Sequence, residues 1–162
     1  MTSDPSLDLT LTPLRGDGRT IREWMTTFHL ASVVLDPYTN ESSWVLKTAA
    51  RVLDAFRGAA VRVNFVLTCG PEEAEQFLGP YADQFLVFTD PDRAFVASLG
   101  LQTLPAFVFL RIDGTVQAVA EGWDAAGWRR VADSIASATA WTRPTLPVPS
   151  DPGPFHGTPA LA

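Results

Sequence analysis

Apolar residues follow two different periods along this chain, and the two periods divide it into expected strands and helices. Compact apolar runs rich in Val, Leu and Phe are typical of strands that are buried on both faces of a sheet. The run at residues 30–35 and the alternating pattern at residues 61–67 are the clearest cases. We expect strands at residues 7–14, 30–35, 61–67, 84–88, 106–111 and 115–120.

Apolar residues at helical spacing separate these strands. In residues 44–57, Val45, Ala49 and Val52 recur every three or four positions, and a glycine follows as a stop. Ser42 or Ser43 is then the expected N-cap of this helix. Residues 20–28 fit either a short helix or an irregular crossing. We expect helices at residues 44–57, 71–78, 94–99 and 125–138.

The alternation of strands and helices predicts the architecture of an α/β fold. It implies a largely parallel sheet with helices on both faces, and an Asp113-Gly114 hairpin makes the sheet mixed. Six prolines and two glycines near the C-terminus prevent any regular element there. We therefore divide the chain into an N-terminal strand and extension (residues 1–29), a central domain (30–140) and a Pro-rich extended tail (141–162).

Composition argues against several classes of function. The chain has 162 residues, and 46% of them are hydrophobic, which is enough for a core. Its net charge of −6, with no run of like charge, offers no basic groove for nucleic acid. No apolar run approaches the roughly 18–20 residues that cross a bilayer, and the first residues lack the features of a signal peptide. We expect a cytoplasmic protein that binds neither nucleic acid nor membrane, and we leave its oligomeric state open.

Residues for redox chemistry or metal binding are few. Cys69 is the one cysteine, so an intramolecular disulfide is excluded. The two histidines, His29 and His156, lie far apart without ligand spacing around them. We therefore expect neither a metal site nor a cofactor.

A combination of motifs appears in the second half of the chain. A strand ends at Asp90, a short helix follows, and the loop from Gly100 to Pro105 leads into an apolar strand and the Asp-Gly hairpin. This combination resembles the thioredoxin-like redoxins over roughly residues 30–138. The resemblance implies a thioredoxin-like fold, in which a central mixed β-sheet is flanked by helices. It also implies that Pro105 is the cis-proline beside the redox centre, where the family presents a backbone edge to an extended peptide or a substrate thiol.

The first half of the chain departs from this family. Redoxins carry Cys-x-x-Cys at the start of the long helix, but residues 36–44 contain no cysteine, and Ser42 lies near the position of the first one. Serine cannot exchange disulfides, because that chemistry needs a thiolate. The peroxidatic cysteine that peroxiredoxins carry in this loop is missing as well. We therefore expect a degenerate active site without dithiol–disulfide oxidoreductase activity, and we leave open whether the chain is another kind of enzyme.

The hypothesis that we favour is a non-catalytic binding or accessory module, because the determinants of the fold are retained and the reagents are missing. Such a module would recognise a protein partner through the cis-proline groove. Its expected contacts are the C-terminal tail and the residues Tyr38, Trp44, Leu104 and Pro105.

Two alternatives belong to other classes of function. The first is a redoxin-type antioxidant oxidoreductase that relies on Cys69 alone. Cys69 follows the carboxyl end of an expected parallel strand, and α/β sheets bind ligands at that end of their strands. The second is an anion or small-molecule binder at the N-terminus of the long helix, where Ser42 and Ser43 would add hydroxyl donors to free backbone N–H groups.

Overall fold

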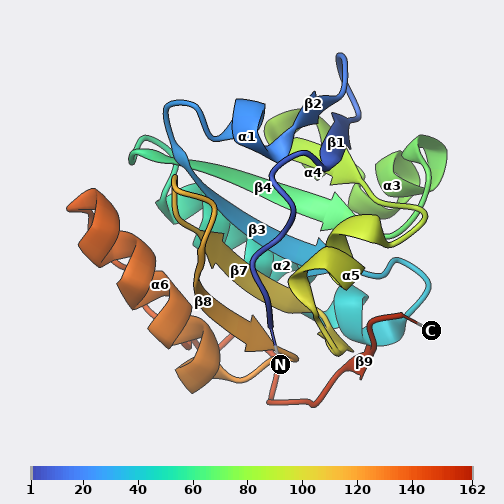
Figure 1. Ribbon diagram of the computed structural model, residues 1–162. Helices are drawn as coiled ribbons and strands as arrows, with labels where there is room; N and C mark the ends of the chain where they lie inside the picture. The colour runs from blue at the N-terminus through green and yellow to red at the C-terminus, as the bar shows by residue number, and fades with distance from the viewer. Residues whose placement is uncertain (1, 162) are drawn as a thin grey trace.

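Seven strands form one mixed sheet in the computed structural model, which describes residues 2–161 (Figure 1). Their order across the sheet is β2-β1-β5-β4-β3-β7-β8, with β3, β4 and β5 parallel and the other neighbours antiparallel. The strands are β1 (Thr10–Pro13), β2 (Arg19–Thr20), β3 (His29–Leu35), β4 (Val61–Leu67), β5 (Leu86–Thr89), β7 (Ala106–Leu110) and β8 (Val116–Glu121). The sheet is mixed, as the sequence predicts, but the expectation of a largely parallel sheet was wrong, because β1, β2, β7 and β8 all pair antiparallel with their neighbours.

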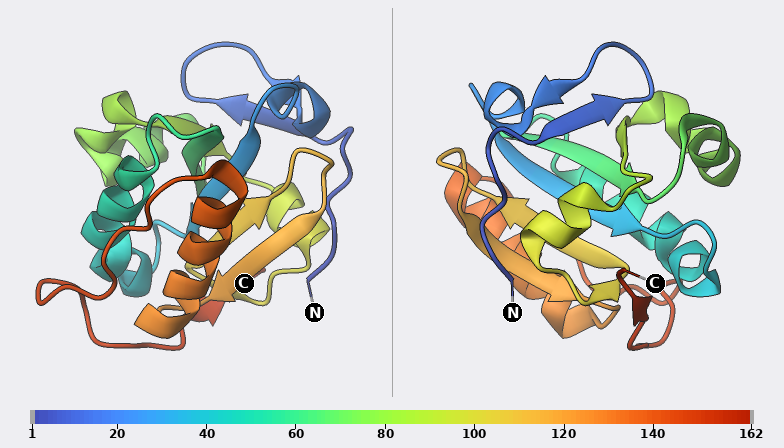
Figure 2. Two further views of the ribbon diagram at one scale, coloured as in Figure 1. Left: turned by 90° about the vertical axis from the view of Figure 1, so that its left-hand side faces the viewer. Right: turned by 45° about the vertical axis from the view of Figure 1, so that its right-hand side comes forward.

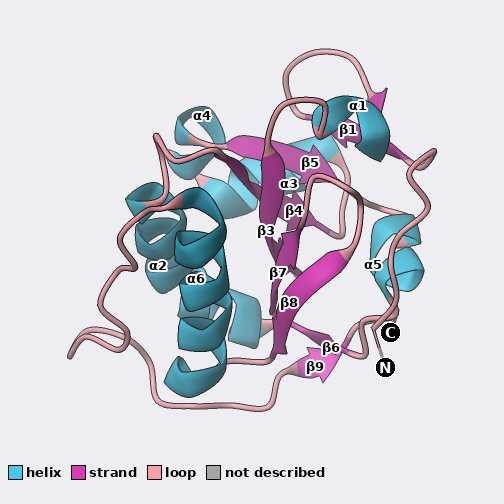
Figure 3. Cartoon of the chain, turned by 60° about the vertical axis from the view of Figure 1, so that its left-hand side comes forward, coloured by secondary structure: helices cyan, strands magenta, loops and turns pink. Residues whose placement is uncertain are grey.

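Helices cover both faces of the sheet. The long helices α2 (Asn40–Ala55) and α6 (Ala125–Thr139) lie side by side on one face, and α5 (Ala94–Leu99) lies on the other (Figure 3). The short helix α1 (Ile21–Trp24) packs into the same core as α5, whereas α3 (Pro71–Leu78) and α4 (Tyr81–Gln84) pack into the core of α2 and α6. The sheet therefore separates two apolar cores.

Strand β3 illustrates how the sequence produces these two cores. Successive side chains of a strand point to opposite faces of the sheet. Val33 and Leu35 thus enter the core beneath α2 and α6, while Leu30 and Val34 enter the core beneath α5. A strand buried on both faces requires a nearly continuous apolar run, which is what the sequence has at this point.

Local signals set most of the helix starts. Pro71 occupies the first turn of α3, where its missing N–H costs nothing. The Asp124 side chain caps α6 by accepting a hydrogen bond from the Gly127 N–H. Residues 20–28, which fit either a short helix or an irregular crossing, contain the one-turn helix α1. Thr20 and Glu23 start this helix with a capping box, in which the side chain of each accepts a hydrogen bond from the backbone N–H of the other.

The expected start of the long helix was wrong by one turn. Helix α2 begins at Asn40 with Thr39 as its N-cap residue, so Ser42 and Ser43 lie inside the first turn and neither is the cap. The Ser42 hydroxyl instead accepts a hydrogen bond from the Asp36 N–H at 2.9 Å. That contact ties the first turn of α2 to the end of β3.

The Pro-rich tail lies along the domain (Figure 2). Arg51 of α2 donates a hydrogen bond to the Thr145 carbonyl, and Arg129 of α6 donates one to the Leu146 carbonyl, each at 2.8 Å. Contrary to the expectation that no regular element forms in the tail, residues Thr158–Pro159 form the short strand β9. Strand β9 pairs antiparallel with β6 (Thr103–Leu104) in a second, two-stranded sheet, because an extended segment needs few main-chain donors to add to a strand edge. Within the described residues, no helix is long and apolar enough to cross a membrane.

Candidate functional site

The candidate site lies where the turn after β3, the first turn of α2 and the loop before β7 meet. Asp36 holds this junction together. Its buried carboxylate accepts a hydrogen bond from the Tyr38 N–H at 3.0 Å and forms an ion pair with Arg93 at 3.0 Å. Arg93 precedes α5 on the opposite face of the sheet, so this ion pair joins the two sides of the site.

The two serines at this junction have different environments. Ser42 is fully buried, and its hydroxyl is engaged by the Asp36 N–H and lies 3.4 Å from the Thr39 hydroxyl. Ser43 is exposed to solvent on the next position of the helix. The structure therefore turns one of the two hydroxyls inward, and a ligand at the N-terminus of α2 would meet Ser43 without Ser42.

Two aromatic side chains are exposed beside the junction. Tyr38 is 68% exposed and Trp44 is 55% exposed, which is unusual for residues of this size. The indole of Trp44 packs edge-on against Phe155 of the tail, with 5.6 Å between the ring centroids. Trp44 therefore contacts the tail while keeping half of its surface free.

Cys69 lies close to the junction but is shielded from it. It follows the end of β4, is only 2% exposed, and belongs to the core beneath α2. Burial, with smaller contributions from Glu73 and Asp36, raises the pKa of the Cys69 thiol to about 12. A reactive cysteine needs an accessible thiolate in an electropositive setting, and Cys69 has neither feature.

The loop before β7 supplies the backbone edge of the site. Leu104 and Pro105 are both buried, and the peptide bond between them is cis. The Pro105 carbonyl accepts a hydrogen bond from the Gly122 N–H at 2.7 Å, which fixes the loop to the end of β8. Residues 103 and 104 form β6, and one edge of this short strand faces the tail.

The tail occupies that edge. Thr158 pairs with Leu104 and Pro159 pairs with Thr103, and the Ala160 N–H donates a hydrogen bond to the Gln102 carbonyl at 2.9 Å. Figures 1 and 2 show β9 and the end of the chain beside the start of α2. Residues 158–160 are thus held as an added strand beside β6.

Contacts on both sides of β9 complete the attachment. The Arg93 guanidinium donates a hydrogen bond to the Ala160 carbonyl while it pairs with Asp36. On the other side, Trp123 and Phe155 exchange two main-chain hydrogen bonds of 2.9 and 2.8 Å. One guanidinium therefore links the tail to the turn between β3 and α2.

Two glycines allow the tail to approach so closely. Gly157 has φ +101°, and a Cβ atom there would lie closer than 3.0 Å to the Leu104 carbonyl oxygen. Gly122 has φ +76°, and a Cβ atom there would collide in the same way with the His156 carbonyl oxygen. Both glycines have a positive φ that other residues rarely adopt, so both serve backbone conformation as well as space.

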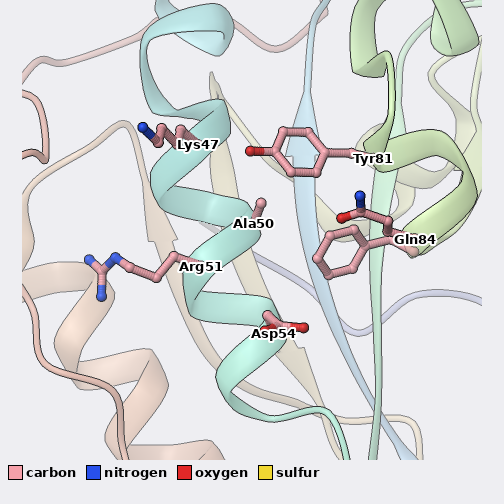
Figure 4. Close-up of a pocket in the computed structure, with 7 residues that line it drawn as sticks. Lys47, Ala50, Arg51, Asp54, Tyr81 and Gln84 are labelled. Carbon is pink, nitrogen blue, oxygen red and sulfur yellow. The ribbon is translucent and has the colours of Figure 1, made fainter.

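A separate hollow of about 370 Å³ lies between α2 and α4 (Figure 4). In Figure 4 the Tyr81 hydroxyl points towards α2, on the side of Lys47. The lining residues are Lys47, Ala50, Arg51, Asp54, Tyr81, Gln84 and Phe85, none of which is a site residue expected from the sequence. Among residues 2–161, no group of three or more His, Cys, Asp or Glu side chains is arranged to hold a metal ion.

Comparison with known proteins identifies the fold. A secreted disulfide oxidoreductase of Mycobacterium tuberculosis, homologous to E. coli DsbE, matches with a TM-score of 0.63 and 22% identity over 81% of this chain and 96% of its own. Peroxiredoxin Q from Xanthomonas campestris matches with a TM-score of 0.64 and 17% identity over 83% and 90%. A hypothetical protein from Sinorhizobium meliloti matches with a TM-score of 0.69 and 13% identity over 99% and 94%. Neither a protein-family model nor a curated protein sequence matches the chain.

The chain therefore has the thioredoxin-like fold of the redoxins, and with a single cysteine it lacks their Cys-x-x-Cys motif. Trp44 and Leu104 contact the tail, with Pro105 next to Leu104, whereas Tyr38 lines a hollow with Glu73 and Phe77 of α3. The structure adds residues that the sequence analysis missed, namely Asp36, Arg93, Gly122 and Gly157. One sequence signal could have pointed to Gly157. It is a glycine that interrupts the extended, proline-rich tail.

Proposed function

We propose that this chain is a thioredoxin-fold binding module that recognises an extended segment of a partner protein along β6 and carries out no thiol–disulfide chemistry. The observation that carries the proposal is the antiparallel pairing of β6 with β9. An exposed strand edge binds an extended peptide by adding it as a further strand, with main-chain hydrogen bonds for affinity and side-chain slots for specificity.

The surroundings of β6 support a binding role. A strand laid beside Leu104 also meets the Arg93 guanidinium, which donates to a carbonyl of that strand, and the exposed indole of Trp44. Exposed aromatic side chains and arginine are the residue types that contribute most to protein interfaces. Tyr38, at 68% exposure, offers a further aromatic side chain in the turn after β3.

The chemistry of the thiol supports the non-catalytic part of the proposal. Disulfide exchange and peroxide reduction both begin with attack by a thiolate. Cys69 is the only thiol of the chain, it is almost completely buried, and its pKa is raised to about 12. At neutral pH it is a protonated core side chain.

An oxidoreductase is the second candidate, because a disulfide oxidoreductase and a peroxiredoxin share the fold. It would have to use Cys69 after a movement that exposes the thiol. Turnover decides between the two functions. Full-chain wild type and Cys69→Ser would be assayed with oxidised glutathione under an excess of dithiothreitol, and separately with hydrogen peroxide. We expect both proteins to match the uncatalysed rate, whereas turnover that Cys69→Ser abolishes would refute the binding module.

The partner and the compartment belong to the same proposal. We propose a protein partner and a cytoplasmic location for this chain. Fractionation of cells that express the full chain at its natural level tests the location, and recovery in the membrane or exported fraction would contradict it.

A further inference from the structure

We propose that residues 155–160 are a built-in copy of the partner segment, so that the site takes an extended strand with a small side chain at the place of Ala160 and the tail competes with the partner for it. This inference rests on the proposed function and names the ligand class and the regulation of the same site. Three features of the tail support it: its pairing with β6, the burial of Ala160, and two glycines that differ in backbone conformation.

Ala160 defines the narrowest place in the site. It is only 1% exposed, its N–H donates to the Gln102 carbonyl, and its carbonyl accepts from Arg93. Its methyl group belongs to the core beneath α5, together with Leu101 and Leu104. A side chain larger than alanine has no room there without displacing these core residues, so the site selects a small residue at this position.

The remaining positions of the segment are held less tightly. Phe155 packs against Trp44 and is partly exposed, and Pro159 and Leu161 are exposed. The attachment of the segment therefore depends mainly on its backbone, on Ala160 and on the aromatic contact at Phe155. An extended segment of another protein that offers an aromatic residue, a glycine and a small residue at the same spacing makes the same contacts.

The tail has an advantage over such a partner because it is attached to the domain. A tethered segment acts at an effective concentration on the order of millimolar, so it occupies the site unless the partner binds more tightly or the tail is released. The tail is also anchored at Asp151, whose carboxylate binds Thr48 and Arg51 of α2. This anchor opposes the release of residues 155–160 and so adds to the advantage of the tail over a partner.

Two glycines of the tail provide a matched pair of variants. Gly157 has a positive φ, and a Cβ atom there would overlap the Leu104 carbonyl oxygen, so Gly157→Ala forces the segment away from β6. Gly153 lies four residues earlier, its φ is not in the left-handed region, and a Cβ atom there meets nothing within 4 Å. Gly153→Ala therefore makes the same chemical change in the same tail without displacing it, and neither variant alters β6.

The test measures binding of a labelled peptide to three full-chain proteins: wild type, Gly157→Ala and Gly153→Ala. The probe is a fluorescein-labelled peptide with the sequence of residues 153–161, and a second peptide carries Ala160→Trp. Hydrogen exchange of the Ala160 amide reports whether the tail has left β6. We expect Gly157→Ala to exchange at least about tenfold faster and to bind the first peptide at least about tenfold more tightly than the other two proteins. We expect the Ala160→Trp peptide to bind at least about tenfold more weakly.

Each other result overturns a definite part of the reasoning. Equal affinity of wild type and Gly157→Ala would show that the tail does not compete, and unchanged exchange in Gly157→Ala would show that it does not need Gly157. Equal binding of the two peptides would refute the selection for a small residue while leaving the binding function intact. A released tail with no binding of either peptide would refute the proposed function itself. A concentration-dependent dimer of the wild type that Gly157→Ala abolishes would show that the tail occupies a second copy of the chain instead.

Discussion

Substitution of Asp151 by alanine tests how firmly the tail is held to α2. The Asp151 side chain is 2% exposed, and its carboxylate accepts hydrogen bonds of 2.8 Å from the Val148 N–H, the Thr48 hydroxyl and Arg51. A hydrogen bond to a charged group contributes about 1.5–3 kcal/mol, and loss of one partner of a buried ion pair costs about 3–5 kcal/mol. The Arg51 side chain stays one-third exposed, so water can solvate its charge after the substitution, and we place the loss at about 2–3 kcal/mol.

The substitution lowers the free energy needed to open the tail more than the free energy of global unfolding, because the tail can leave while the sheet stays folded. A loss of 2–3 kcal/mol corresponds to a fall in protection of about 30- to 150-fold. The Phe155 amide reports the opening, since it donates to the Trp123 carbonyl at 2.8 Å. We expect its hydrogen exchange to accelerate by that factor in Asp151→Ala, while the amides of β3 keep their protection.

A control on the same helix separates the tail contact from the loss of a charge. Asp54 pairs with Arg57 at 2.8 Å on the exposed surface of α2, where ion pairs contribute little. Asp54→Ala should leave the exchange of the Phe155 amide within about twofold of wild type. An Asp151→Ala protein that also stays within that range would contradict the role of Asp151 in holding the tail.

The pH dependence of the Asp151 contact follows from the direction in which the pKa of Asp151 is shifted. Burial alone would raise the pKa of Asp151, but its hydrogen bonds from Val148, Thr48 and Arg51 outweigh burial and hold the pKa below its ordinary value of 3.8. A carboxyl group with a lowered pKa in the folded protein stabilises it above the unfolded value, and this contribution disappears as the pH falls through the folded value. Protection of the Phe155 amide, corrected for intrinsic exchange, should stay constant from pH 7 to about pH 5 and fall below about pH 4.

Three further predictions concern the thiol, the ion pair and the core. Because the pKa of Cys69 rises from 9.0 to about 12, its alkylation by iodoacetamide at pH 8 should be at least about a thousandfold slower than that of free cysteine, and its rate should climb through pH 10 without a plateau. A plateau near pH 9 would contradict the burial of the thiol. Arg93→Ala should cost about 3 kcal/mol in urea unfolding because it leaves the buried carboxylate of Asp36 without its cation, and Arg93→Lys should cost less. A cost below about 0.5 kcal/mol would show that this pair behaves as an exposed one. Trp128 is fully buried beside Phe107, so Trp128→Ala should cost about 3–5 kcal/mol, whereas Trp44→Ala should change global stability by less than about 1 kcal/mol. Equal losses at the two tryptophans would contradict the burial described for them.

The periodicity of apolar residues predicted most of the sheet. Strands β3 and β7 are buried on both faces, and a nearly continuous apolar run is the direct consequence of that environment. The helix starts that depend on local chemistry, such as Pro71 in α3 and Asp124 before α6, were also predicted, because their physical cause lies within a few residues of sequence.

The parts that the sequence did not predict depend on distant contacts. Ser42 resembles an N-cap, but its hydroxyl accepts a hydrogen bond from the Asp36 N–H, and the helix begins two residues earlier, at Asn40. The pairing of β9 with β6 joins residues more than fifty positions apart, and neither strand has an apolar period of its own. Arg93 lies in a polar turn of the sequence. Its two partners, Asp36 and Ala160, are each more than fifty positions away, so no local pattern indicates them.

Intermolecular contacts between the isotope-labelled peptide of residues 153–161 and full-chain Gly157→Ala, observed by nuclear Overhauser effects, test the binding function most directly. The peptide is expected to lie antiparallel to β6, with Thr158 of the peptide opposite Leu104 and Ala160 beside the Gln102 carbonyl, as the tail does in the wild type. Contacts to the hollow between α2 and α4 alone, or the absence of contacts to β6 in a protein whose tail has been released, would contradict the function proposed for this chain.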